Sequence, residues 1–282
     1  MQISRFDDIA DAYRVVFLDS YGVLRNHKGL IPGAVACIER LRAKGKYIRV
    51  LTNNAARSPE VAAERLAYYG LKGILPSEII TSGATTRQFL EQKVRQGKVA
   101  YLGTPDSAAY IVGAGLEPIP IADVDFDRLD EIQAVAFLDD EGYDMNTDIN
   151  ILINLLRQCQ VPVVVANTDL LYPVAANEVA LATGSIARLA EYVLRRRFVK
   201  FGKPAIQMFQ LGLESVLEQC PDISPADIVM VGDTLHTDIL GGNTFGIATT
   251  LVLSGNTRAE NAATEIESSG IIPDYICRSI GQ

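Results

Sequence analysis

The chain has 282 residues, of which 48% are hydrophobic and 21% are charged, and its formal net charge is −8 at pH 7. These values are typical of a globular protein and exclude disordered, collagen-like and low-complexity chains. We expect no nucleic-acid partner, because no run of Lys and Arg dominates and phosphate contacts need clustered cations. We expect no membrane partner either, since the longest apolar runs have five or six residues and a spanning helix needs about 20.

Apolar, strand-like runs alternate with amphipathic, helix-like stretches along the chain. The predicted strands are, in chain order, residues 15–20, 47–53, 98–103, 132–140, 161–169, 227–233, 248–253 and a short one at 274–279. The predicted helices are residues 32–44, 59–70, 85–94, 148–160 and 205–219. This alternation predicts parallel sheets that are covered by helices on both faces.

The alternation restarts after the helix that begins near Thr81 and returns to its first block after residues 191–204. We therefore predict a discontinuous core made of residues 1–82 and 200–282, with an inserted α/β domain at 83–199. Both sizes fall in the usual range for domains. The expected fold class is α/β, with a Rossmann-like, doubly wound parallel sheet in the core and a second α/β unit inserted into it.

The expected location of the protein is the cytoplasm. The N-terminal segment carries acidic residues and has no apolar stretch of signal-peptide length. The four cysteines form no CxxC pair, and their apolar or helical surroundings are typical of buried free thiols in a reducing compartment: Cys37, Cys159, Cys220 and Cys277. The two histidines, His27 and His236, are too few for a histidine-based metal site.

The first candidate site residue is Asp19, which follows the apolar residues 15–18 and precedes Gly22. Asp19 therefore lies at the carboxyl end of a predicted buried strand, and ligands bind at that end of open parallel sheets. An aspartate that only caps the turn after the strand gives the same pattern. On this motif alone, both interpretations stay open.

The second candidate group is Thr52, Asn53 and Asn54, at the end of the next predicted strand. A hydroxyl, an amide and neighbouring backbone N–H groups suit phosphate oxygens. The alternative is turn chemistry, in which Asn54 caps the following helix, although Ser58 before Pro59 is the better cap.

The third candidate is Lys203, which lies between Gly202 and Pro204. Pro204 fits the first turn of a helix, where a lysine can meet an anion, but a solvated surface lysine is the simpler interpretation. The three arginines at 195–197 are more typical of a solvated helix end than of a binding patch.

The fourth motif, residues 227–242, is the most specific segment of the chain. Asp233 ends an apolar run, and Asp238 follows five residues later. Two carboxylates at this spacing in a strand-to-helix turn can converge on one hard cation. The alternative is a helix-capping aspartate followed by an ordinary helix aspartate. His236 lies between them as a turn residue, because oxygen-rich sites favour Mg²⁺ over the metals that bind imidazole.

The four motifs in this order resemble the haloacid dehalogenase (HAD) superfamily over nearly the whole chain. The segments that carry the resemblance are DSYGV at 19–23, TNN at 52–54 followed by Arg57 and Ser58, FGKP at 201–204 and VGDTLHTDI at 231–239. The large insert between the second and third motifs is similar to the NagD-like and p-nitrophenylphosphatase-like branch, whose members are sugar-phosphate and nucleotide phosphatases. The resemblance implies a magnesium-dependent phosphatase that acts on a small phosphorylated substrate.

The resemblance also implies a role for each motif residue. Asp19 would be the nucleophile that forms an aspartyl phosphate. Thr52 and Asn53, beside Asn54, would hold the transferring phosphoryl group, and Lys203 would offset the charge on it.

For the metal, the resemblance implies that Asp233 binds Mg²⁺ together with Asp19 and the backbone carbonyl of Tyr21. Asp238 would support the metal indirectly, through contacts with the groups that bind it. The insert would be a cap, and its segment 161–173 resembles the cap loop that reads the substrate: Asn167, Thr168 and Asp169. Caps of this branch often mediate dimers, so a homodimer through the cap is a further expectation.

One position departs from the family pattern DxDx[TV], because Tyr21 stands where the second aspartate is expected. A phenol with a pKa near 10 is a poor base at neutral pH, although it can donate a proton. Loss of a positioned acid–base group costs about 10²–10⁴ in rate. We therefore expect a slow phosphatase, and the alternative is a protein that binds or transfers phosphate without hydrolysis. A dinucleotide enzyme is excluded, because no GxGxxG run follows the first strand.

Overall fold

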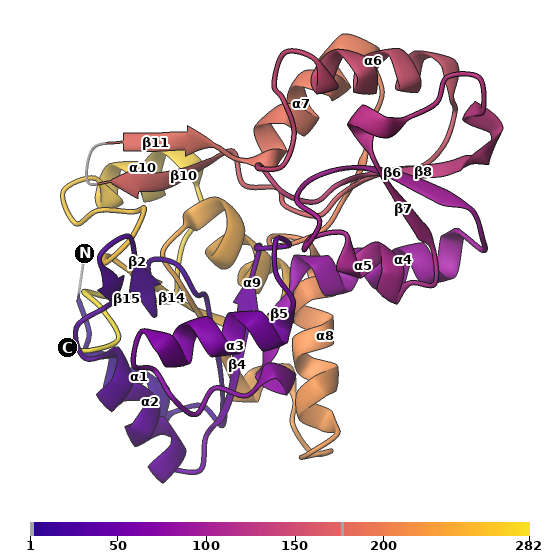
Figure 1. Cartoon of the computed structure of the whole chain (residues 1–282). Helices are drawn as coiled ribbons and strands as arrows, with labels where there is room; N and C mark the ends of the chain where they lie inside the picture. Colours follow the sequence, from indigo (N-terminus) through magenta and orange to yellow (C-terminus); the bar gives the residue numbers. More distant parts are fainter. Residues whose placement is uncertain (1–2, 176–177) are drawn as a thin grey trace. The chain divides into compact units, whose positions relative to one another are not determined.

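The computed structural model describes residues 3–175 and 178–282, which form two compact units (Figure 1). The core unit is made of the chain up to Thr52 together with Pro59–Ile80 and Lys203–Gln282. The insert unit is made of Asn53–Ser58 and Thr81–Gly202. The predicted domain limits at 82/83 and 199/200 stay predictions, and the observed units differ from them mainly in Asn53–Ser58.

The core unit is built on a six-stranded sheet with the order β15-β14-β13-β1-β4-β5. Its strands are β1 (Val15–Leu18), β4 (Tyr47–Thr52), β5 (Ile79–Thr81), β13 (Ile228–Gly232), β14 (Ala248–Val252) and β15 (Tyr275–Cys277). The pairings of β1 with β4 and β13, of β13 with β14, and of β14 with β15 are parallel. The α/β fold with a parallel sheet is therefore confirmed.

Alternate residues of the central strands enter two different apolar layers, as the period of two in a strand requires. Val16 and Leu18 of β1 belong to one buried cluster, and Val15 and Phe17 belong to the other. The first cluster takes in residues of α1 (Phe6–Asp11), α2 (Ala34–Ala43) and α3 (Pro59–Tyr68), and the second takes in residues of α8 (Ile206–Leu217). The remaining core helices are α9 (Leu240–Phe245) and α10 (Ala262–Ser269). Because helices cover both faces of the sheet, every residue of β1 is buried.

The insert unit repeats this design around a five-stranded sheet with the order β12-β9-β8-β6-β7. The strands are β6 (Lys98–Leu102), β7 (Glu117–Pro120), β8 (Ile132–Phe137), β9 (Val163–Val165) and β12 (Val199–Lys200). The helices are α4 (Ser82–Lys93), α5 (Ala109–Gly113), α6 (Asp148–Gln158) and α7 (Thr183–Leu194). Residues of α6 and α7 join one apolar cluster of the sheet, and residues of α4 and α5 join the other.

Two antiparallel ribbons and three short strands, one of which is β12, were not expected from the sequence. The ribbons are β2–β3 (Arg25–Asn26 and Gly29–Leu30) in the core unit and β10–β11 (Leu171–Ala175 and Glu178–Leu181) in the insert unit. Strand β7 is largely exposed and contains two prolines, so it lacks the apolar run that marks a buried strand. Strand β5 has only three residues.

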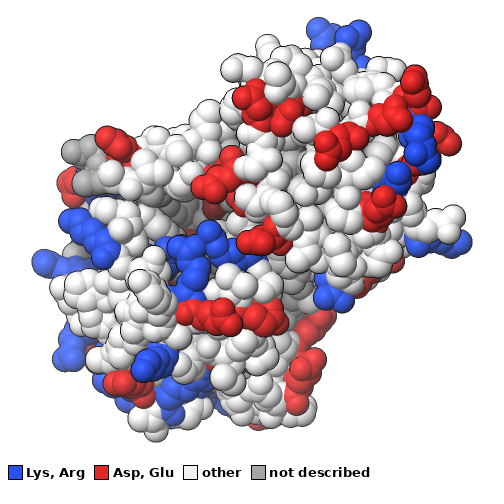
Figure 2. Space-filling view, viewed as in Figure 1, with Lys and Arg blue, Asp and Glu red and all other residues white. Residues whose placement is uncertain are grey.

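One face of the molecule carries charged side chains of both signs (Figure 2). On the face shown in Figure 2, Lys and Arg side chains are mixed with Asp and Glu side chains rather than forming one continuous basic stripe. Within the described residues, every helix is too short or too polar to reach across a lipid bilayer.

We predict that Phe17→Ala lowers the free energy of unfolding by about 3–5 kcal/mol. Phe17 is fully buried beneath α8, so the truncation leaves a cavity beside β1, the strand that precedes Asp19. Urea denaturation measures the change. The matched control is Phe126→Ala, because Phe126 is 38% exposed and its loss should change stability far less. Equal effects of the two substitutions would contradict the assigned core.

Candidate active site

Three of the predicted residues lie at the carboxyl edge of the core sheet, on neighbouring strands. Asp19 follows β1, Thr52 is the last residue of β4, and Asp233 follows β13. The Asp19 N–H donates to the carbonyl of Val231 at 2.9 Å, so the parallel pairing of β1 with β13 continues up to the first carboxylate. The sheet register itself therefore brings the first and fourth sequence motifs together.

Asp19, Asp233 and Asp238 form a compact cluster of carboxylates. One oxygen of each lies within 4.8 Å of the others, and all three residues are buried. Lys203 is buried with them: its Nζ forms an ion pair with Asp238 Oδ1 at 2.8 Å and another with Asp19 Oδ1. The structure thus unites the residues of three sequence motifs around one ammonium group.

Burial shapes the protonation of this cluster. Removal from water raises the pKa of Asp19 to about 7, against the opposing effect of Lys203. Burial, followed by the charges of Asp19 and Asp238, raises the pKa of Asp233 well above its ordinary value. Burial disfavours the charged form of Lys203, but Asp19 and Asp238 outweigh it and raise the pKa of this group, so the lysine stays protonated.

The donor set fits a hard divalent cation. The cluster holds three buried carboxylates and one ammonium group, which pairs with Asp19 and Asp238, so the fully ionised cluster keeps an excess of negative charge. Carboxylate oxygens are the ligands that Mg²⁺ and Ca²⁺ prefer. A divalent cation would balance the excess that one lysine leaves.

Asp238 is positioned by an unusually wide helical turn. Residues Leu235–Ile239 form a π-helical turn, in which the Ile239 N–H points to the Thr234 carbonyl at 3.4 Å. The Thr234 N–H donates to Asp238 Oδ2 at 3.1 Å. Such turns are frequent at functional sites. A side chain at Gly232 would overlap the Asp238 carboxylate, so the end of β13 requires glycine.

Asp233 is held by a loop that the sequence analysis did not single out. Asp233 Oδ2 accepts from the Asn256 N–H at 2.7 Å, and Asp233 Oδ1 accepts from the Thr234 hydroxyl at 2.9 Å. The Ser254 hydroxyl donates to the Gly22 carbonyl at 2.7 Å. This loop follows β14, the next strand along the sheet, so the carboxyl-edge argument applied to Asp19 could have found it.

Tyr21 is half-buried and packs beside a cation. The Arg25 guanidinium carbon lies 5.3 Å from the centre of the Tyr21 ring. Burial raises the pKa of Tyr21, against the opposing charge of Arg25. The phenol therefore stays protonated at neutral pH and does not act as a base there.

Some of the predicted phosphate- and substrate-binding residues of the insert unit are linked to one another by hydrogen bonds, whereas Asn54 forms a hydrogen bond within a turn. Asn53 Nδ2 donates to Asp169 Oδ1 at 2.9 Å, and Asn167 Oδ1 accepts from the Asp169 N–H at 2.9 Å. These residues are therefore linked, with Thr168 between them in the chain. Asn54 is exposed and accepts from the Ala56 N–H at 3.1 Å, as the turn interpretation expects.

The predicted place of Pro204 in the first turn of a helix is wrong. Helix α8 begins at Ile206, and its N-cap residue, Ala205, is extended. Lys203 therefore lies in the loop that precedes the helix. Its position comes from its two carboxylate partners rather than from the helix terminus.

Comparisons with known proteins show the family of the chain. Residues 16–117 match the haloacid dehalogenase-like hydrolase family, and residues 200–282 match a HAD-hydrolase-like family. A glycerol-3-phosphate phosphatase from Gallus gallus is 30% identical over 94% of this chain and 89% of its own length. The chain belongs to the HAD superfamily.

Solved structures indicate the branch of the superfamily to which the chain belongs. A possible sugar phosphatase of the HAD superfamily from Cytophaga hutchinsonii is 45% identical, covers 100% of this chain and 99% of its own, and superposes with a TM-score of 0.96. A p-nitrophenyl phosphatase from Archaeoglobus fulgidus is 25% identical over 95% of this chain and 97% of its own, with a TM-score of 0.81. The protein is a HAD phosphatase of the NagD-like and p-nitrophenylphosphatase-like branch.

We predict that Gly22→Ala lowers kcat/KM of this HAD phosphatase by about 10²-fold, the size of effect expected when a reacting group is misplaced by about 1 Å. Gly22 has a φ of +87°, and a Cβ there would overlap the Asp233 carboxylate. Steady-state kinetics on p-nitrophenyl phosphate measure the change.

The matched control is Gly73→Ala. Gly73 has a φ of +91°, and a Cβ there would meet no atom within 4 Å. Both substitutions carry the backbone cost of about 1–2 kcal/mol for an L-residue in this region, but only one displaces Asp233. Equal activity of the two variants would contradict the assignment of Asp233 to the site.

Proposed function

We propose that the protein is a magnesium-dependent phosphatase that hydrolyses a small phosphate monoester through an aspartyl phosphate on Asp19. The observation that carries the proposal is the buried cluster of Asp19, Asp233 and Asp238 around Lys203. The relatives that are named as glycerol-3-phosphate and sugar phosphatases support a substrate of sugar-phosphate or nucleotide size.

The first chemical step belongs to Asp19. Its carboxylate oxygen attacks phosphorus in line with the leaving oxygen, a P–O bond to the protein forms, and the P–O bond to the leaving group breaks. Water then attacks the phosphorus of the aspartyl phosphate and releases inorganic phosphate and the carboxylate. The covalent intermediate divides one difficult displacement into two easier ones.

Charge neutralisation is the main catalytic task, because a phosphate dianion repels an attacking carboxylate. Lys203 offsets negative charge on Asp19 and on the transferring group, and its raised pKa keeps it protonated. Mg²⁺, held by Asp19, Asp233 and the backbone carbonyl of Tyr21, would supply further positive charge against the phosphate oxygens. Asp238 holds Lys203 in place through their ion pair.

The remaining assignments are proposals of the same kind. The hydroxyl of Thr52, at the edge where Asp19 lies, is the proposed donor to the transferring phosphoryl group. Asn53, Asn54, Asn167, Thr168 and Asp169 stay predicted phosphate- and substrate-binding residues, and Asn54 also accepts a hydrogen bond within a turn. A homodimer through the insert also stays a prediction.

Tyr21 sets the expected substrate preference. A carboxyl group at this position would protonate the leaving oxygen and later activate water, whereas a phenol with a raised pKa is a much weaker acid and, while protonated, cannot activate water. We propose that turnover is slow and favours leaving groups that depart without a proton, such as those of aryl and acyl phosphates.

We predict that Asp19→Asn lowers kcat on p-nitrophenyl phosphate by at least about 10³-fold, because the amide oxygen is a far weaker nucleophile. Removal of divalent metal with EDTA should abolish the activity of the parent, and added Mg²⁺ should restore it. Asp8→Asn is the control, since Asp8 is an exposed residue of α1 in the same unit. Full activity of Asp19→Asn would overturn the proposed mechanism.

We predict that Tyr21→Asp raises kcat/KM on sugar phosphates by about 10²–10⁴-fold and changes the rate on p-nitrophenyl phosphate much less. Tyr21→Asn, which has the same size and no carboxyl group, should give no such gain. The measurement is a panel of alkyl and aryl phosphates for each variant. Comparable parent rates on both substrate classes would contradict the preference, and a parent that is inert on the panel beside an active Tyr21→Asp would favour a non-hydrolytic role.

A further inference from the structure

A pocket with a different chemistry from the Asp19 site lies within the insert unit. It has a volume of about 950 Å³ and lies between the end of α7 and strand β12. Five of the 26 Lys and Arg residues of the chain line it: Arg188, Arg195, Arg196, Arg197 and Lys200. Such a concentration is unexpected in a protein whose net charge is −8.

The single carboxylate of this pocket is already satisfied. Glu191 is buried, its Oε2 forms an ion pair with Lys200 Nζ at 2.6 Å, and its Oε1 accepts from the Phe198 N–H at 2.8 Å. Arg196 donates to the backbone carbonyls of Cys159 and Val161. Glu191 and Arg196 thus hold the pocket wall in shape.

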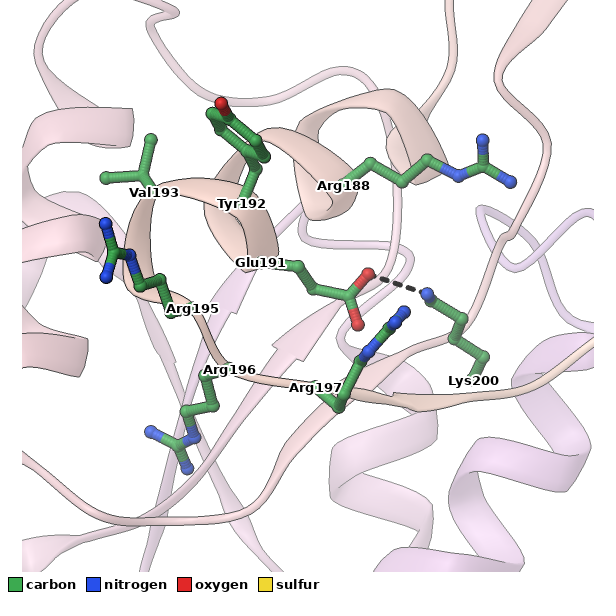
Figure 3. Close-up of a pocket in the computed structure, with 8 residues that line it drawn as sticks. All are labelled: Arg188, Glu191, Tyr192, Val193, Arg195, Arg196, Arg197 and Lys200. Atoms are coloured by element: carbon green, nitrogen blue, oxygen red, sulfur yellow. Dashed lines mark hydrogen bonds and ion pairs between the residues drawn. The ribbon is translucent and has the colours of Figure 1, made fainter.

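The other guanidinium groups have donors to spare. Within the described part of the chain, the side chains of Arg188, Arg195 and Arg197 make no hydrogen bond or ion pair with a protein group. Figure 3 shows Arg188 and Arg197 on the same side of Glu191 as Lys200, while Arg195 and Arg196 lie on the other side. Arg188, Arg197 and Lys200 therefore share one side of the pocket (Figure 3).

The helix dipole does not explain this arrangement. Cations at a helix C-terminus gain about 0.3–1 kcal/mol, but the effect is confined to the last turn. Helix α7 ends at Leu194, so Arg188 lies well before its last turn, and Lys200 belongs to the next strand. The pattern seen in the sequence, three arginines at a helix end, is thus only part of the group.

A second copy of the chain is also a poor occupant. In a symmetric dimer the same patch lies on both sides of the interface, so the unpaired arginines would face each other. A small anion fits better. Ligand sites of about 300–1,000 Å³ hold small molecules, and the arginine fork binds two phosphate oxygens at once.

We propose that this pocket binds a small molecule that carries two adjacent phosphate groups, with Arg188, Arg197 and Lys200 as its ligands. Three cationic groups offer more donors than one phosphate can use, whereas a diphosphate presents two charged groups for them to bind. The site belongs to the insert unit alone and does not depend on the proposed reaction at Asp19.

The test is titration calorimetry of the full chain with inorganic pyrophosphate in a buffer that contains EDTA. We expect saturable binding that weakens as salt is added, since the contacts are ionic. Arg188→Gln/Arg197→Gln should bind at least about tenfold more weakly, because charge-assisted hydrogen bonds are lost. The control is Lys93→Gln/Arg95→Gln, which removes the same charge from exposed positions of the insert unit and should stay within about twofold of the parent.

Three results would overturn the proposal: no binding of pyrophosphate to the parent, equal weakening in both double variants, or equal affinity for orthophosphate and pyrophosphate. Binding of an acidic peptide by a parent that ignores pyrophosphate would assign the surface to a protein partner instead. Circular dichroism and the Tm of each variant verify folding. Activity at the Asp19 site is a separate measurement, so failure of one proposal leaves the other intact.

Discussion

The core unit depends on one electrostatic arrangement, the burial of three carboxylates around a single ammonium group. Lys203 lies between Asp19 and Asp238, and the pKa of Asp233 beside them is raised by burial. Isolated charges are costly to bury unless they are paired, so one lysine leaves the cluster incompletely compensated. A divalent cation would offset the negative charge that Lys203 leaves uncompensated.

The geometry that makes this arrangement possible is that of the parallel sheet. Strands β13, β1, β4 and β14 all end at one edge, and each delivers polar atoms there: Asp233, Asp19, Thr52 and the loop with Asn256. Helices on both faces bury the strands but leave this edge available. The site also requires glycine at two positions, because side chains at Gly22 or Gly255 would occupy the space of the Asp233 carboxylate.

Much of this could be predicted from the sequence, since buried strands that end in aspartate are visible in the pattern. Asp19 and Asp233 were found in this way, and Lys203 through its motif. The loop after β14 could have been found by the same argument, but its particular hydrogen bond from Asn256 to Asp233 and the π-helical turn at Asp238 could not, because they depend on backbone positions rather than on residue type. The basic pocket was missed for a related reason. Arg188 and Lys200 lie on either side of the arginine run in sequence, and only the packing of α7 beside β12 brings them together.

The discontinuous core has a consequence for how the protein is made. Asp19 and its partner Lys203 are 184 residues apart, and Asp233 and Asp238 come later still. A ribosome must therefore release most of the chain before these groups can meet. The continuous stretch Thr81–Gly202 emerges as one piece and can fold first, because domains tend to form in the order of synthesis. During translation, β1 and β4 remain without their partner β13 until the last part of the chain is made. We expect the chain to depend most on chaperones in the period between synthesis of β4 and synthesis of β13.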